Sequence, residues 1–151
     1  MSSVDVGLAA RSPRGQLRRE GPARMIAVAA LLATGLCGCS SPGSSPQTAV
    51  ETFLRALGAK DTATACSVVA YAGQPLAGDD VTLCRSGFDA VVAEGTPTDL
   101  DALRSATVGA VSVSGDRATV RAEDLSGVPT AYRQPLALVR VGGQWYVDVP
   151  Q

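Results

Sequence analysis

The side chains with the most distinctive chemistry in this sequence are four cysteines, Cys37, Cys39, Cys66 and Cys84. The chain has no His, so Asp or Tyr would have to supply any general acid or base near neutral pH. It also has no phosphate-binding glycine loop, nucleophile elbow or zinc-binding helix. We therefore expect no catalytic residue, no metal site and no cofactor.

Cys39 lies at the end of an export signal. Five arginines precede the uncharged stretch Met25 to Leu36, which is shorter than the roughly 20 residues of a membrane-spanning helix. The sequence Leu36-Cys37-Gly38-Cys39 resembles the bacterial lipobox, in which a small residue precedes the lipid-modified cysteine. The resemblance implies cleavage of a signal peptide over residues 1–38 and acylation of Cys39, with acyl chains such as palmitate. A plain secreted protein is the alternative.

The charge of the chain changes at this cysteine. Residues 1–38 hold five Arg and two acidic residues, a net +3, whereas the rest holds eight basic and twelve acidic residues, a net −4. Without a basic stripe, nucleic acid is not an expected partner. We expect a lipid-anchored domain at the outer face of the cell membrane. The rarity of Lys and the lack of Asn and His resemble the usage of high-GC, actinobacterial genomes.

Residues 39–47 are rich in Ser and Pro and are typical of a flexible tether, whose span we expect to be roughly 15 Å. The domain then covers residues 48–151. Within it, Cys66 and Cys84 form a disulfide in the oxidising conditions outside the cytoplasm, or else stay as two buried free thiols. Two cysteines without any His fall short of the four ligands of a structural zinc site.

Apolar residues recur at helical spacing in the first half of this domain. The pattern predicts a helix over 49–57, a second over 62–71 capped by Asp61, and a third from Asp79 or Asp80 to Gly95. A short helical turn is expected over 99–104. The disulfide would then join the second helix to the third.

The spacing changes to alternation in the second half. Alternating residues over 111–114 and 118–122 lie on either side of Gly115-Asp116, and residues 136–141 and 144–149 flank Gly142-Gly143, so we expect two hairpins. Helices followed by an antiparallel sheet predict an α+β domain with the helices on one face.

Three segments together resemble the nuclear transport factor 2-like lipoprotein domains. They are the helix over 49–57 followed by Asp61, the segment Gly115 to Val120, and the terminal segment Leu138 to Asp148. The resemblance covers about residues 47–149 and implies a curved antiparallel sheet wrapped on a helix, a cone that can hold a ligand. The additional strand that this family has near its third helix is not evident in the sequence.

Members of this family include enzymes and domains without chemistry, so fold alone does not decide function. We expect a non-catalytic module that binds a small apolar ligand or an envelope protein. Tyr71 and Trp145 are candidate pocket residues, although Trp145 also fits the core. The alternative is an isomerase-, cyclase- or dehydratase-like enzyme with a buried carboxylate in the cone. Asp148 is the carboxylate considered for that role, on the face of the last strand opposite Trp145.

Overall fold

The computed structural model describes residues 41–149. The predicted signal peptide over 1–38, the lipobox and Cys39 lie outside this range. Along the described chain the elements are α1 (Pro46–Gly58), α2 (Thr62–Ser67), β1 (Val69–Tyr71), β2 (Gln74–Pro75), α3 (Asp79–Glu94), α4 (Pro97–Arg104), β3 (Thr107–Val108), β4 (Val111–Ser114), β5 (Arg117–Val120), the 3₁₀ turn Ala122–Asp124, β6 (Leu125–Ser126), the 3₁₀ turn Thr130–Tyr132, β7 (Leu136–Val141) and β8 (Gln144–Val149).

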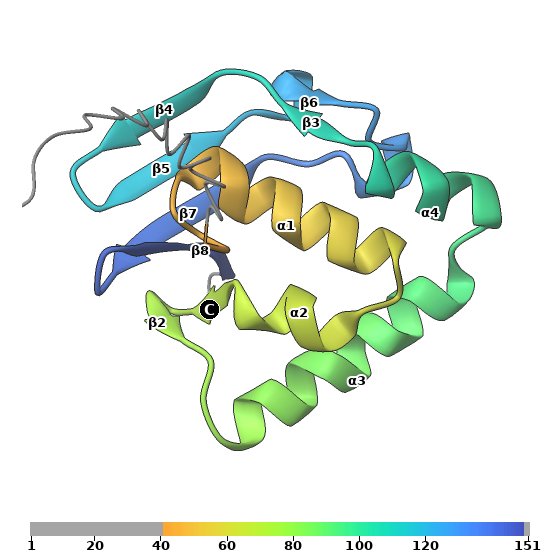
Figure 1. Ribbon diagram of the computed structural model, residues 1–151, viewed down its shortest axis with the longest axis horizontal. Coiled ribbons are helices and arrows are strands. Elements are labelled where there is room, and N and C mark those ends of the chain that lie inside the picture. The colour runs from red at the N-terminus through yellow and green to blue at the C-terminus, as the bar shows by residue number, and fades with distance from the viewer. Residues whose placement is uncertain (1–40, 150–151) are drawn as a thin grey trace, which may run out of the picture. The chain divides into compact units, whose positions relative to one another are not determined.

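Residues 41–149 form an α+β domain, as predicted, with helices packed on a six-stranded sheet (Figure 1). The strand order is β2-β1-β8-β7-β5-β4, and β3 and β6 form a separate two-stranded ribbon. The sheet is mixed, because β1 runs parallel to β8 while every other neighbouring pair is antiparallel. It is also open, with β2 and β4 as its edges. The expectation of a purely antiparallel sheet was therefore wrong at one pair.

Helix α1 forms the centre of the helical layer. Ser45 caps it, since the Oγ of this residue accepts a hydrogen bond from the backbone N–H of Thr48 at 3.1 Å, and Pro46 occupies the first turn. The predicted apolar face is buried against the sheet, which contributes Leu138, Trp145 and Val147 to the same core. Figure 1 shows α1 in front of the strands, with α2 and α3 below it.

The second helix is shorter than predicted. It ends at Ser67, and Val69–Tyr71 form β1 instead of a further helical turn. Ala72 and Gly73 both have positive φ, at 51° and 80°, and form the two-residue turn that leads into β2. This hairpin is a strand pair near the third helix that the sequence did not reveal.

The capping residue predicted from the sequence is correct for α2 but not for α3. Asp61 caps α2 as expected, with its Oδ1 accepting from the backbone N–H of Thr64 at 3.0 Å. Neither Asp79 nor Asp80 caps α3, because Gly78 is the capping residue and both aspartates lie in the first helical turn. The helical turn expected over 99–104 is a full helix, α4, which Thr96 caps.

The segment before α1 is held against the sheet. The backbone N–H of Trp145 donates to the carbonyl oxygen of Gly43 at 2.8 Å, and Gly43 is buried. A Cβ at Gly43 would lie 2.6 Å from the carbonyl oxygen of Trp145, and φ there is 78°, so only Gly fits. Residues 43–47 of the predicted tether thus belong to the folded domain, and α1 begins at Pro46 instead of near residue 49.

Candidate functional site

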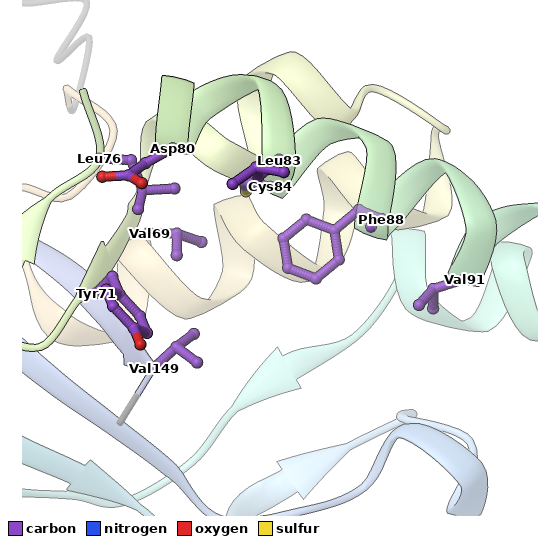
Figure 2. Close-up of a pocket in the computed structure, with 10 residues that line it drawn as sticks. Val69, Tyr71, Leu76, Asp80, Leu83, Cys84, Phe88, Val91 and Val149 are labelled. Carbon is purple, nitrogen blue, oxygen red and sulfur yellow. The ribbon is translucent and has the colours of Figure 1, made fainter. Parts of the chain in front are cut away.

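A cavity of about 610 Å³ lies between α3 and the end of the sheet formed by β1 and β8 (Figure 2). Small-molecule sites in proteins have volumes of roughly 300–1,000 Å³, so this cavity has the size of a ligand pocket. Its lining residues come from β1, the segment that follows β2, α3 and the last residue of β8. They are Val69, Tyr71, Leu76, Asp80, Leu83, Cys84, Gly87, Phe88, Val91 and Val149.

Helix α3 forms one wall of the cavity. Its lining residues recur at helical spacing from Asp80 to Val91 and so lie on one face. Only Val92 of this helix is buried, whereas Leu83 is 68% exposed and Val91 is 40% exposed. Three of the apolar residues whose spacing predicted this helix, Cys84, Phe88 and Val91, therefore face the cavity, and Phe88 points into it in Figure 2.

The sheet forms the opposite wall. Val69 pairs with Val147 and Tyr71 pairs with Val149, so these four residues share one face of β1 and β8. The first pair is buried in the core, but Tyr71 and Val149 are exposed. The two strands thus extend beyond the core, and the cavity lies over their ends.

Asp148 holds the hairpin that supplies this wall. Its Oδ1 accepts a hydrogen bond from the backbone N–H of Gly73 at 2.8 Å, and its Oδ2 accepts one from Nη1 of Arg117 at 3.1 Å. The side chain of Asp148 is 9% exposed. It lies on the face of β8 opposite Trp145, as predicted, and therefore away from the cavity. This carboxylate keeps the turn at Ala72 and Gly73 against the sheet.

Three links hold α3 in place. The disulfide predicted between Cys66 and Cys84 is present and joins α2 to α3, with Cα atoms 6.1 Å apart. Phe88 meets Phe53 of α1 edge to face, with ring centroids 5.3 Å apart. The hydroxyl of Thr62 donates to Oδ1 of Asp89 at 2.8 Å. Since few side chains of α3 are buried, these three links contribute much of the interaction that holds α3 to α1 and α2.

Gly87 keeps the middle of this wall free of a side chain. A Cβ built there would meet no atom within 4 Å. Glycine in a helix interior is about 1 kcal/mol less favourable than alanine, so its presence in mid-helix calls for a reason. The open space in front of Gly87 is the cavity itself.

The side chains that line the cavity are mostly apolar. Asp80 is its one charged residue and is exposed, and the hydroxyl of Tyr71 is its other side-chain oxygen. The remaining lining groups are hydrocarbon, the phenyl ring of Phe88, the disulfide sulfur of Cys84 and the backbone of Gly87. Such a surface favours apolar ligands through the hydrophobic effect and offers little for orienting a polar one.

Of the two residues predicted to line a pocket, the structure places one at the cavity. Tyr71 lines it, at the end of β1. Trp145 does not line it, because this residue is only 6% exposed and belongs to the core beneath α1. The guanidinium carbon of Arg140 lies 5.5 Å from the centroid of the Trp145 ring. The α3 residues were missed because a helical apolar face is normally buried, and only the exposure of Leu83 and Val91 distinguishes this one.

Residues 41–149 contain no helix long and apolar enough to cross a membrane, and no cluster of three His, Cys, Asp or Glu side chains that could hold a metal ion. The candidate site is defined by the shape of the cavity and by its apolar lining. No protein-family model matches the chain, and neither a curated protein nor a solved structure resembles it at a significant level.

Proposed function

We propose that this chain is a lipoprotein tethered to the outer face of the cell membrane, whose domain binds a small apolar ligand without catalysis. The observation that carries the proposal is the cavity between α3 and β1, with its almost entirely apolar lining. Burying apolar ligand surface there contributes about 25 cal/mol for each Å² removed from water. Ligands would be selected by size and apolar character.

The order of elements supports a resemblance to the nuclear transport factor 2-like domains. Helices come first, a hairpin precedes α3, and β1 then lies beside β8 in one sheet. The hairpin supplies a strand pair at the place where the family has its additional strand. Under this proposal the cavity is the mouth of the family's cone.

The enzyme alternative would need a carboxylate buried in the cavity beside a second polar group. Asp80 is exposed at the cavity, and Asp148 is bound to Gly73 and Arg117 on the other face of the sheet. Both observations favour binding over catalysis.

A neutral dye whose fluorescence rises in apolar surroundings, such as N-phenyl-1-naphthylamine, tests the ligand site. We expect the chain to bind the dye and Gly87→Phe to abolish binding, because the new ring fills the cavity. Ala93→Phe is the matched control, since Ala93 is exposed on the same helix and does not line the cavity. Equal binding by both variants would overturn the proposed site.

The tether has a separate test. We expect mass spectrometry of the chain purified from bacterial membranes to find a mature amino terminus at an acylated Cys39, and Cys39→Ser to release the protein from the membrane fraction. A mature terminus at any other residue contradicts the proposed anchor and leaves the ligand site to be judged by the dye.

A further inference from the structure

The large apolar residues exposed on the described part of the chain are concentrated around the cavity. Five are exposed, and four of them line it: Tyr71, Leu83, Val91 and Val149. We call these four residues the rim. The fifth, Val113, lies on β4 at the far edge of the sheet. Single exposed apolar residues are ordinary on protein surfaces, but a cluster marks an interaction surface.

The rim is exposed because no element of residues 41–149 covers it. Tyr71 and Val149 lie where β1 and β8 extend past the core, and Leu83 and Val91 lie on α3, which buries only Val92. Figure 2 shows the two groups on opposite sides of the cavity. A partner that covers the rim must therefore also cover the cavity mouth.

The length of chain between the anchor and the fold limits where the rim can lie. Because Gly43 is hydrogen-bonded to Trp145, only three residues separate Cys39 from the folded domain, and the four Cα-to-Cα steps from Cys39 to Gly43 span at most about 14 Å. Trp145 and Val149 are four residues apart on β8, a distance of about 13 Å. Val149 of the rim is thus about as far along β8 from the Gly43 contact as Cys39 can be from Gly43, so a bilayer holding Cys39 is within reach of this end of the rim.

The charges of the cavity lining indicate which force would drive contact between the rim and a bilayer. None of the ten lining residues is Lys or Arg, and the single charged residue is Asp80. Attraction to anionic lipid requires basic side chains near the surface. Contact here would instead arise from inserting apolar side chains among neutral lipids, and it would be insensitive to salt.

We propose that the rim docks on the bilayer to which the chain is anchored, so that the cavity opens toward the lipid. This inference rests on the anchor and the ligand site proposed above. An apolar ligand then moves between bilayer and cavity without crossing water, and the class of ligand is one that partitions into membranes.

Tryptophan reporters on the full acylated chain, reconstituted into phosphatidylcholine vesicles, test the docking. Leu83→Trp places the reporter on the rim, and Val113→Trp is the matched control at an exposed apolar site away from the cavity. Trp145 is buried and gives a constant background. With lipids brominated near the start of their acyl chains, we expect loss of most of the emission added by Leu83→Trp and little loss for Val113→Trp, at low and high salt alike.

The outcomes separate the docking from the proposed function. If the chain floats with the vesicles and binds the dye, but the two reporters are quenched equally, the docking is wrong and the proposed function stands. If Leu83→Trp is quenched but the parent chain, which keeps Leu83 in the cavity lining, binds no dye, the docking stands and the ligand site fails. A chain that does not float with vesicles overturns both the anchor and the docking.

Discussion

Gly87 and Gly58 are both helical glycines, but their surroundings are opposite. A Cβ at Gly87 meets open space, whereas a Cβ at Gly58 would lie 2.5 Å from the carbonyl oxygen of Leu100 and 2.7 Å from the amide nitrogen of Arg104. We expect Gly87→Ala to raise the free energy of unfolding by about 1 kcal/mol through helix propensity. Gly58→Ala should lower it by about 1–3 kcal/mol, because α1 and α4 must move apart. Urea unfolding monitored by circular dichroism measures both, and a shift in the same direction for the two variants would contradict the packing described.

The cap at Asp61 predicts a dependence of stability on acid. Hydrogen bonds from the side chain and the backbone N–H of Thr64 lower the pKa of Asp61 below its ordinary value of 3.8. A carboxyl with a lower pKa in the folded state stabilises the fold above its unfolded pKa, and this contribution is lost as pH falls through the folded value. We expect Asp61→Asn, which keeps a capping oxygen, to show a smaller loss of stability below pH 3.8 than the parent. Urea titrations at neutral and acid pH test this, and equal acid losses would rule out a contribution from Asp61.

At the scale of residues, the sequence could predict which cysteines pair, but not which apolar side chains remain exposed to solvent. The pairing of Cys66 with Cys84 was predicted from an expected location outside the cytoplasm, with two free thiols as the alternative, and the structure confirms the disulfide. The burial of Trp145 in the core was one of two predicted outcomes. The cavity lining was not foreseen, since Phe88 and Val91 have the same spacing as core residues. Only the packing of α3 against the rest of the chain decides whether that face is filled.

At the scale of elements, the disulfide links a well-packed helix to a poorly packed one. Replacing Cys66 and Cys84 together by Ala opens a loop with a sequence separation of 18, which we expect to lower the free energy of unfolding by about 3 kcal/mol. Dye binding should weaken as well, because Cys84 lines the cavity and the bond helps to hold α3. Calorimetry and dye titration measure the two effects.

A control must separate loss of the α3 wall from loss of stability. Leu125→Ala removes a buried side chain of β6 and should cost about 2–5 kcal/mol without touching the cavity. We expect this variant to bind the dye normally at temperatures where it is folded. If it loses the dye as the cysteine variant does, the effect of the disulfide is on stability alone.

The elements that the sequence predicted well are those with a strong local pattern. The helix over 49–57 and the two late hairpins have clear spacing, and their turns at Gly115 and Gly142-Gly143 have the expected positive φ. The hairpin of β1 and β2 was missed for a local reason. Its strands have three and two residues, and its turn is Ala72-Gly73 instead of Asn-Gly or Asp-Gly. β1 is stabilised by pairing with β8, about 78 residues later in the chain, which no local pattern can reveal.

At the scale of the whole molecule, the fold shortens the predicted tether. The composition of residues 39–47 is typical of flexible chain, and this expectation took no account of a tertiary contact. The hydrogen bond between Trp145 and Gly43, together with the close approach that only glycine permits, holds the last part of that segment on β8. In the proposal made above, a shorter tether restricts which face of the domain can meet the membrane, and this restriction connects the proposed anchor to the cavity.

The proposed docking predicts that Gly43→Ala alters contact with the bilayer more than it alters folding. A Cβ at this position would lie 2.6 Å from the carbonyl oxygen of Trp145, so the segment must leave β8. The free tether would then run from Cys39 to Pro46, with a maximal span of about 25 Å instead of about 14 Å. We expect lower bromolipid quenching of the Leu83→Trp reporter, while the free energy of unfolding falls by only about 1 kcal/mol for the lost hydrogen bond. Gly115→Ala is the control, since it also replaces a glycine of positive φ but lies in a turn with open space around it. Unchanged quenching in Gly43→Ala would mean that the rim reaches the bilayer without help from a short tether.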